Sequence, residues 1–371
     1  MLGKIKSIID SSINRWLDNR RSVFAANSDN QACNADVMQT KLSKDEVANV
    51  YKVWGGIANS CTKLSIPYFC LIKHYIGFDA RYLAGSVYIP HVCYALNPIN
   101  TVEYFSHKGL LDLVCHEVPR PSTIIKSVGT VLLNSSNKIC SLEEAVRNIA
   151  REEEPLILKL STDSCMGLNI KKISPHSDNE NIKTLLEQYK ETDFVIQRFV
   201  KQSEQTAKFN SSSLNSFRIT TFNVNNTASV GSRVIRFGAP DSFVDNIGGG
   251  SGGIMIGVDT KGILSNFGYD VHGYRKTSHN GINFGGACID NFSKVEELAL
   301  NLHSNMPNIG IIGWDIALDH NDSPVLIEAN TIWPGIAIEQ LCTGPIFGDR
   351  TEEVIDYVKH HPFHRKKIFM F

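Results

Sequence analysis

Two carboxylates and one amide in the last third of the chain have the types and spacing of a site for a hard cation. Asp315 follows the apolar run IIGW, and Glu328 and Asn330 end a second run, PVLIEAN. Side chains alternate between the faces of a strand, so Glu328 and Asn330 point the same way. A turn at 320–324 predicts a hairpin that places Asp315 beside them. Mg²⁺ is commonly held by such oxygens together with nucleotide phosphates, although ordinary polar residues at strand ends are the alternative.

A lysine at the end of another predicted strand has the pattern of a phosphate ligand. Lys159 leaves the run LILK and enters the small, polar loop STDSCMG. An ammonium in this place can bind phosphate oxygens while loop amides cap them. The loop is not a Walker sequence, and a solvated lysine is the alternative interpretation.

Three arginines and an asparagine precede the metal-like hairpin. Arg218 ends NSFR, Arg233 and Arg236 delimit RVIR, and Asn246 precedes the glycines at 248–250 and 252–253. Because the guanidinium fork matches carboxylate and phosphate geometry, this group suggests anion binding. Surface salt bridges are the alternative.

The order of these blocks resembles the ATP-grasp superfamily, and in detail the sugar-transfer associated ATP-grasp family of surface-polysaccharide biosynthesis. The resemblance runs over residues 78–348. It rests on Lys108 with the later Pro119-Arg-Pro121, on Lys159 and its loop, on Val195-Ile-Gln197, and on four more specific blocks: SLNSFRITTF, RVIRFGAPDSFVDN, IGWDIALD and LIEAN.

This resemblance implies an ATP-grasp fold in which two α+β lobes clasp ATP, with Mg²⁺, expected as two ions, as the second cofactor. It assigns the nucleotide to Lys108, Lys159, Ser161, Ser164, Gly167, Gln197, Arg198, Phe199 and Val200. It assigns catalysis at the transferred phosphoryl group to Arg218, Arg233, Arg236 and Asn246. The implied magnesium ligands are Asp315, Glu328 and Asn330.

The implied activity is an ADP-forming carboxylate–amine ligase with an acyl phosphate intermediate, which joins an amino acid or amine to a carboxylated sugar or sugar nucleotide. Two alternatives stay open: a kinase on a hydroxyl, and a nucleotide-binding module without turnover. The chain departs from the family pattern in its phosphate loop, which has Leu160 after the lysine and only Gly167, beside Met166. The segment at 278–281 is shortened and lacks proline, which leaves the acceptor open.

Composition narrows the class of protein. The 371 residues carry 37 basic and 38 acidic side chains, so neither nucleic acid nor bulk membrane electrostatics is indicated. Nine cysteines without a C-x-x-C pair favour a reducing, cytoplasmic location over a zinc site or disulfides. We expect small-molecule partners, no secretion leader and no membrane-spanning segment. The helical stripe at 2–16, flanked by basic residues, faces either its own domain or a membrane surface.

The periodicities predict an α+β chain with four parts: a mainly helical region at 1–105, a small lobe at 106–200, a large lobe at 201–350 and a basic tail at 351–371. A capping box, Ser43-x-x-Glu46, begins a helix at 44–54, and further helices are expected at 142–151, 179–189 and 294–305. Strands are expected at 86–89, 130–133, 155–160, 194–200, 217–224, 229–236, 253–259, 314–319 and 325–328.

Other reactive residues have plainer interpretations. Cys165 has no histidine partner placed by the sequence, so we interpret it as a loop residue. His360, His361 and His364 are expected in a solvated tail rather than around a metal. Trp314 and Trp333 flank the hairpin, and either stacking on a ligand or packing in a core fits them.

Overall fold

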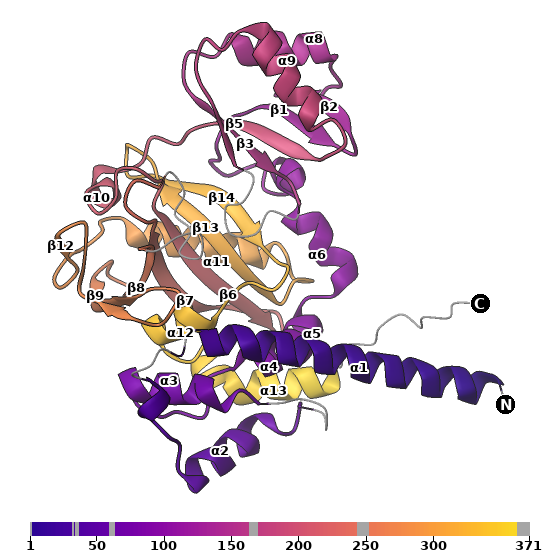
Figure 1. Cartoon of the computed structure of the whole chain (residues 1–371), viewed down its shortest axis with the longest axis vertical. Helices are drawn as coiled ribbons and strands as arrows, with labels where there is room; N and C mark the ends of the chain where they lie inside the picture. The colour runs from indigo at the N-terminus through magenta and orange to yellow at the C-terminus, as the bar shows by residue number, and fades with distance from the viewer. Residues whose placement is uncertain are drawn as a thin grey trace.

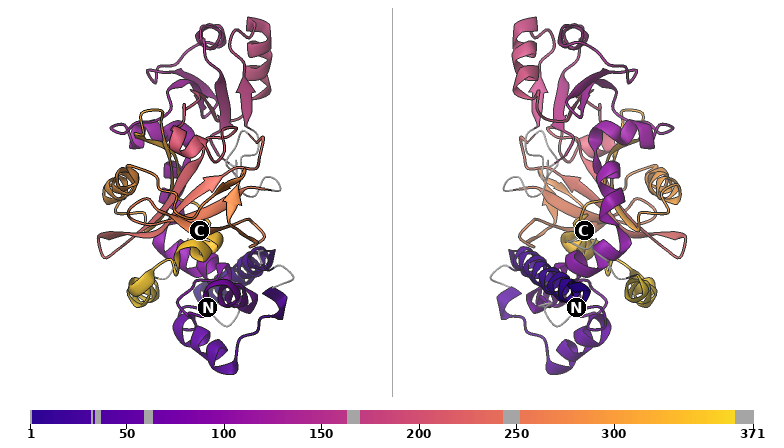
Figure 2. Two further views of the ribbon diagram at one scale, coloured as in Figure 1. Left: turned by 90° about the vertical axis from the view of Figure 1, so that its left-hand side faces the viewer. Right: turned by 90° about the vertical axis from the view of Figure 1, so that its right-hand side faces the viewer.

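The structure is a computed structural model that describes residues 2–31, 33, 37–58, 64–162, 170–242 and 252–361. Three parts follow one another along the long axis of the molecule: a small lobe, a large sheet and a helical N-terminal region (Figures 1 and 2). The α+β class and the mainly helical N-terminus are confirmed. No helix among the described residues is long and apolar enough to cross a bilayer.

The N-terminal region shares one core with the large sheet. Its elements are α1 (Leu2–Gln31), η1 (Val37–Gln39), α2 (Lys44–Trp54), α3 (Ile66–Ile76), α4 (Gly85–Val87), the π-helical η2 (Tyr88–Cys93), α5 (Tyr94–Leu96) and α6 (Ile99–Ser106). The predicted capping box is present, since Ser43 Oγ accepts from the Glu46 amide at 3.1 Å and the Glu46 carboxylate accepts from the Ser43 amide at 2.6 Å. Trp54 and Phe69 pack in one cluster with Phe222 and Ile311 of the sheet.

The strand predicted at 86–89 is wrong, because this segment is helical in α4 and η2. The buried carboxylate of Asp29 in α1 accepts hydrogen bonds from the backbone amides of Gly85 and Ser86. These amides begin a helix, where an acceptor satisfies otherwise unpaired donors. A tertiary contact of this kind outweighs the β preference of a four-residue run.

The small lobe is an antiparallel sheet in the order β2-β1-β5-β3-β4 with two helices against it. The connection from α6 contributes η3 (Lys108–Leu110) and α7 (Leu111–Val114). The lobe itself comprises β1 (Thr123–Val128), β2 (Val131–Asn134), α8 (Leu142–Ala150), β3 (Leu156–Leu160), β4 (Lys171–Ile173), α9 (Asn179–Gln188) and β5 (Phe194–Arg198). Its core joins Leu158 and Ile196 of the sheet to Ile149 and Ile182 of the helices.

The large sheet has the order β10-β9-β8-β7-β6-β13-β14. Its strands are β6 (Ser216–Val224), β7 (Thr227–Phe237), β8 (Ile254–Val258), β9 (Leu264–Tyr269), β10 (Arg275–Lys276), β13 (Ile311–Leu318) and β14 (Pro324–Asn330). Helix α11 (Phe292–Ser304) packs through Phe292 and Val295 against one face, in a cluster with Ile235. The remaining elements are α10 (Glu204–Ala207), β11 (Ser278–His279), β12 (Ile282–Asn283), α12 (Ala337–Thr343), η5 (Gly348–Arg350) and α13 (Thr351–His360).

The C-terminal segment differs from the predicted tail in its first half. Residues 351–360 form α13, and Val354, Ile355 and Val358 are buried in the core that the N-terminal region shares with the sheet. Every third or fourth residue of this helix is apolar, a pattern that the basic residues around 360 masked. Residues 362–371 lie outside the described residues.

Candidate functional site

The predicted hairpin of β13 and β14 is present, and it brings the three candidate metal ligands together. Asp315 pairs with Glu328, and Asn330 pairs with Gly313. On the other side of β13, Asp315 pairs with Arg218 of β6. Directly opposed residues of antiparallel strands project from the same face. Glu328, Asp315 and Arg218 therefore form a row across three strands.

Two arginines bind the Asp315 carboxylate. Arg218 contacts it with both arms of its fork, Nε to Oδ1 at 2.5 Å and Nη2 to Oδ2 at 3.0 Å. Arg236 of β7 places Nη2 at 3.0 Å from Oδ2 and donates to Ser216 Oγ at 2.6 Å. Asn330 donates Nδ2 to Asp315 Oδ2 at 3.2 Å and to the Gly313 carbonyl at 3.1 Å. These two bonds use the amide nitrogen of Asn330, so its amide oxygen is the atom that could bind a cation.

The charges of this cluster are fixed by one another. Burial would raise the pKa of Asp315, but Arg218 and Arg236 outweigh it and lower this pKa to about 2. Burial would likewise lower the pKa of Arg218, but Asp315 and Glu339 raise it above its ordinary value. An ionised carboxylate is what a metal ion requires, so the donor set fits Mg²⁺ completed by phosphate or water oxygens.

Gly313 makes room for Arg218 to reach across the sheet. A Cβ atom at Gly313 would lie 3.2 Å from Arg218 Cδ and 3.2 Å from Pro334 Cβ. Both distances are tighter than ordinary van der Waals contact, so a larger residue would displace the arginine. The glycine in the run IIGWD thus shapes the site without any chemistry of its own.

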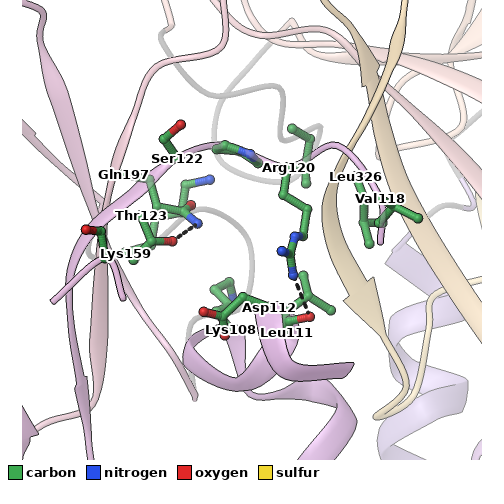
Figure 3. A pocket seen from close by; sticks show the side chains of 13 residues that line it. Lys108, Leu111, Asp112, Val118, Arg120, Ser122, Thr123, Lys159, Gln197 and Leu326 are labelled. Carbon is green, nitrogen blue, oxygen red and sulfur yellow. Dashed lines mark hydrogen bonds between the residues drawn. The ribbon is translucent and has the colours of Figure 1, made fainter. Parts of the chain in front are cut away.

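A cavity of about 300 Å³ lies between the small lobe and the large sheet (Figure 3). Lys159 of β3 and Gln197 of β5 line it from the small lobe, and Leu326 of β14 lines it from the large sheet. Lys108 stands at its base, and its Nζ lies 2.8 Å from Glu328 Oε1. This ion pair joins the cavity to the row of charges on the hairpin.

Comparison with known proteins gives the family. The model of the family described as sugar-transfer associated ATP-grasp matches residues 157–355, which is more than half of the chain. The chain belongs to the sugar-transfer associated ATP-grasp family. No curated protein matches the sequence.

Solved ATP-grasp structures are similar to the chain at low identity. D-cycloserine synthetase is 13% identical with a TM-score of 0.43 over 71% of this chain and 73% of its own. D-alanyl-alanine synthetase A from Vibrio cholerae is 11% identical with a TM-score of 0.39 over 72% of this chain and 65% of its own. Biotin carboxylase from Campylobacter jejuni is 11% identical with a TM-score of 0.43 over 71% of this chain, which spans 48% of its length.

In this ATP-grasp chain, Gln197 lines the cavity, and the candidate nucleotide residues Arg198, Phe199 and Val200 follow it directly in the sequence. Gln197 donates Nε2 to Thr123 Oγ1 at 3.1 Å. Arg198 turns its side chain outward to Glu152, at 2.6 and 3.0 Å, and donates its amide to the Ser122 carbonyl at 3.0 Å. Phe199 stacks under Lys172 Nζ at 5.7 Å from the ring centroid, and Val200 is half-buried. Any contact of Arg198 with a nucleotide would therefore be through its backbone.

The beginning of the phosphate loop is tied to both neighbouring segments. Ser161 donates its amide to the Asp193 carbonyl at 2.8 Å and accepts from the Lys108 amide at 3.2 Å. Its buried hydroxyl oxygen has no hydrogen-bond partner among the described residues. Ser164, Gly167, Cys165 and Asn246 lie outside the described residues.

Arg233 is not part of the charge cluster, which corrects its assignment with the catalytic residues. Its side chain binds Glu296 of α11, with Nε at 2.5 Å and Nη2 at 2.8 Å from the two carboxylate oxygens. Arg233 and Arg236 are three positions apart on one strand, so they project from opposite faces. Arg236 faces Asp315, whereas Arg233 faces α11.

Sequence reasoning missed Glu339, a buried carboxylate on α12. It accepts from Thr220 Oγ1 at 2.6 Å and from the Ser232 hydroxyl, and its other oxygen lies 3.7 Å from Arg218 Nη1. Burial raises its pKa despite the opposing effect of Arg218. Glutamates on short helices usually face solvent, so the sequence carried no signal for this contact.

Among the cavity residues that sequence reasoning missed are Asp112, Arg120 and Thr123. Arg120 donates Nη1 to the Leu111 carbonyl at 3.1 Å (Figure 3). Asp112 accepts from the fully buried Lys126 at 2.7 Å. The Pro119-Arg-Pro121 block was the available signal for Arg120.

The histidines and tryptophans with a non-functional interpretation in the sequence analysis have the following surroundings. His360 and His361 bond to carbonyls of their own helix at 2.9 Å each, and His364 is outside the described residues. His279, in the shortened segment, is buried and donates Nε2 to the Gly238 carbonyl at 3.0 Å.

Trp314 is fully buried and donates to Thr221 Oγ1, so it is a packing residue, whereas Trp333 is 42% exposed.

Proposed function

We propose that the chain is an ATP-dependent carboxylate–amine ligase that forms ADP and phosphate through an acyl phosphate. The observation that carries the proposal is the row Glu328–Asp315–Arg218 beside Arg236, joined by Lys108 to the cavity between the lobes. In such a row the carboxylates can bind cations and the guanidiniums can bind anions, within one buried cluster. The family membership supports use of ATP.

In this proposal ATP occupies the cavity, with residues 106–200 as the small lobe and 201–350 as the large lobe. Lys108 and Lys159 bind phosphates, and the backbone at 197–200 binds adenine. Asp315, Glu328 and Asn330 would hold Mg²⁺, expected as two ions, which would supply positive charge against the phosphates. When nucleotide binds, Lys108 would leave its ion pair with Glu328 for a phosphate, and the Glu328 carboxylate would become available to a cation.

The chemistry has two steps. A carboxylate oxygen attacks the γ-phosphorus and ADP leaves, and an amine then attacks the acyl carbon while phosphate departs with the electrons of the C–O bond. Arg218 and Arg236 stabilise the transferred phosphoryl group and the acceptor carboxylate, because fixed donors act most strongly where charge develops. The family resemblance assigns Asn246 the same role.

The substrates proposed are an amino acid or amine and a carboxylated sugar or sugar nucleotide, and the sugar-transfer description of the family favours this acceptor. The test incubates the protein with MgATP and a matrix of uronic acids and amino acids, and it measures ADP and free phosphate. We expect both products only when acid and amine are present together. ADP without free phosphate would indicate a kinase, and ATP binding without either product would overturn an enzymatic function.

A further inference from the structure

Two large apolar side chains stand exposed directly after the candidate metal hairpin. Ile332 is 46% exposed and Trp333 is 42% exposed, although their neighbours Thr331 and Ile336 are buried. They belong to a corner of the chain, residues 331–336, that connects β14 to α12. Burying these side chains in a ligand complex would remove apolar surface from water.

The corner is held rigidly in a strained conformation. Trp333 has φ +48°, in the left-handed region that a bulky residue adopts only when its surroundings enforce it. The enforcing contacts lie on both sides: Asn97 donates to the Thr331 carbonyl at 2.7 Å, and Tyr88 donates to the Pro334 carbonyl at 2.9 Å. The indole is therefore displayed by a fixed backbone.

The corner lies on the same face as the charge cluster, at the end away from the nucleotide cavity. Pro334 and Arg218 both approach Gly313 from that face. β13 begins at Ile311, next to Asn97 of the N-terminal region, and ends at Leu318, next to Ser203 after the small lobe. Figure 1 shows the small lobe at one end of the sheet and α1 and α5 at the other.

A buried tyrosine and a partly exposed arginine lie behind Trp333 in the N-terminal region. Tyr94 meets Trp333 edge to face, with ring centroids 6.0 Å apart. The Arg21 guanidinium of α1 lies over the Tyr94 ring at 4.6 Å. Its buried Nη1 has no hydrogen-bond partner among the described residues, and Asp18 Oδ1 lies 3.9 Å from it. The Arg21 side chain is 26% exposed, so its guanidinium can also donate to an anion that reaches it from solvent.

We propose that Trp333 and Arg21, with the buried Tyr94 packed between them, form the acceptor subsite, and that the acceptor is a glycosyl phosphate whose sugar ring carries a carboxylate. The proposal rests on the proposed function and names its substrate class. The carboxylate reaches Arg218 and Arg236, the apolar face of the sugar ring lies on Trp333, and the phosphate binds Arg21. One anion at each end of an aromatic surface matches a sugar acid with a phosphate at its anomeric position.

The test is direct binding of UDP-glucuronate, followed by tryptophan fluorescence and calorimetry with Mg²⁺ and a non-hydrolysable ATP analogue present. Glucuronate and UDP-glucose are the comparison ligands. Trp333→Ala should weaken UDP-glucuronate binding at least about tenfold, a loss of about 1.4 kcal/mol, and leave the affinity for the ATP analogue unchanged. Arg21→Gln should weaken UDP-glucuronate and UDP-glucose but not glucuronate.

Matched controls are available on α1. Trp16 is 55% exposed, and Arg20 lies over its ring at 5.0 Å, so Trp16→Ala and Arg20→Gln remove the same groups from an unrelated surface. They should leave binding unchanged. The proposal is overturned if Trp333→Ala binds UDP-glucuronate like the natural chain, if the control variants lose as much, or if UDP-glucuronate does not bind.

The two proposals fail separately. If UDP-glucuronate binding depends on Trp333 but ATP is not cleaved when acid and amine are both present, the ligase proposal is refuted and the subsite proposal stands. Turnover that is unchanged in Trp333→Ala would remove the subsite and keep the ligase.

Discussion

Arg218 lies between two buried carboxylates, and these fix the plane of its guanidinium. Asp315 binds one edge through two hydrogen bonds, and Glu339 approaches the other at 3.7 Å. A lysine would offer a single point charge on a flexible stem and could not reproduce this geometry. The role proposed for Arg218 therefore depends on its shape as much as on its charge.

Arg218→Lys and Arg236→Lys should each lower kcat roughly a hundredfold or more, the scale for losing one fixed donor at developing charge. The affinity for ATP should change little. Arg233→Lys is the matched control, because this arginine binds Glu296 on the opposite face. Steady-state kinetics with ADP and phosphate detection checks the set. Equal effects in all three variants would count against the proposed role.

Glu328→Gln keeps the size of the side chain and removes its charge, so it tests the proposed metal site. We expect turnover to fall to background at every Mg²⁺ concentration, since a neutral amide is a poor bridge between cations. The measurement is product formation across a Mg²⁺ titration. Turnover restored by high Mg²⁺ would indicate weakened affinity, and near-normal turnover would contradict the metal assignment.

Site residues whose positions follow from strand alternation within one hairpin could be predicted from the sequence. Site residues brought together by the packing of separate elements could not. Asp315, Glu328 and Asn330 followed from strand alternation and one tight turn, and the hairpin confirmed their proximity. Glu339 reaches Arg218 only because α12 packs on the sheet, a contact no local pattern encodes. The family resemblance assigned Arg233 together with Arg236, although their spacing of three residues places them on opposite faces.

At the scale of elements, β13 depends on a glycine where Arg218 crosses it. Gly313→Ala would place Cβ 3.2 Å from Arg218 Cδ and from Pro334 Cβ, and Pro334 is held by Tyr88. The arginine must therefore shift by a few tenths of an ångström. We expect kcat to fall at least about tenfold with thermal stability nearly unchanged. Wild-type kcat in this variant would mean that the guanidinium tolerates displacement.

The packing of α11 behind β13 contains a pH-sensitive contact. His303 is fully buried, accepts from Thr221 Oγ1 at 2.6 Å and donates Nε2 to the Ile309 carbonyl at 2.7 Å. Burial lowers its pKa from 6.5 to about 4. The unfolded chain therefore takes up a proton first as the pH falls, so this contribution to stability is complete above pH 6.5 and is lost towards pH 4.

The loss should reach about 3 kcal/mol over this window. About 2 kcal/mol of this loss falls between pH 7 and pH 5. Urea unfolding at these two pH values measures it, and His303→Gln should reduce the difference between them. The exposed His360 provides the control, since His360→Gln should leave the difference unchanged. An unaltered difference in His303→Gln would show that other groups carry the pH dependence.

Helices and strands were predicted well where the periodicity of their own residues determines the secondary structure. They were predicted poorly where a tertiary contact determines it. The helix at 44–54 has its capping box, and the strands predicted at 217–224, 229–236, 253–259, 314–319 and 325–328 match β6, β7, β8, β13 and β14 within three residues, whereas β9 and β10 were not predicted. The segment at 86–89 became helical because Asp29, distant in sequence, caps it. Helix α13 was not predicted, because the basic residues around 360 indicated a solvated tail, although its apolar positions have helical spacing.

At the scale of the whole molecule, the small lobe meets the large sheet across the cavity, and the ion pair of Lys108 with Glu328 links that cavity to the charge cluster. A nucleotide bound there would contact both lobes and add its binding free energy to the folded state. By mass action, MgATP at about a hundred times its Kd should stabilise the protein by about 2.7 kcal/mol.

Lys159→Ala should remove much of this stabilisation, because Lys159 stands on β3 of the small lobe and lines the cavity. A tenfold loss of affinity would reduce the stabilisation by about 1.4 kcal/mol at the same nucleotide concentration. Lys171→Ala is the matched control, since Lys171 lies on the neighbouring β4, opposite Leu158, and is exposed. Thermal unfolding with and without MgATP measures both variants, and their melting temperatures without nucleotide should agree with that of the natural chain. If MgATP stabilises Lys159→Ala and Lys171→Ala equally, Lys159 does not bind the phosphates, and the nucleotide must be held by Lys108 and the large sheet instead.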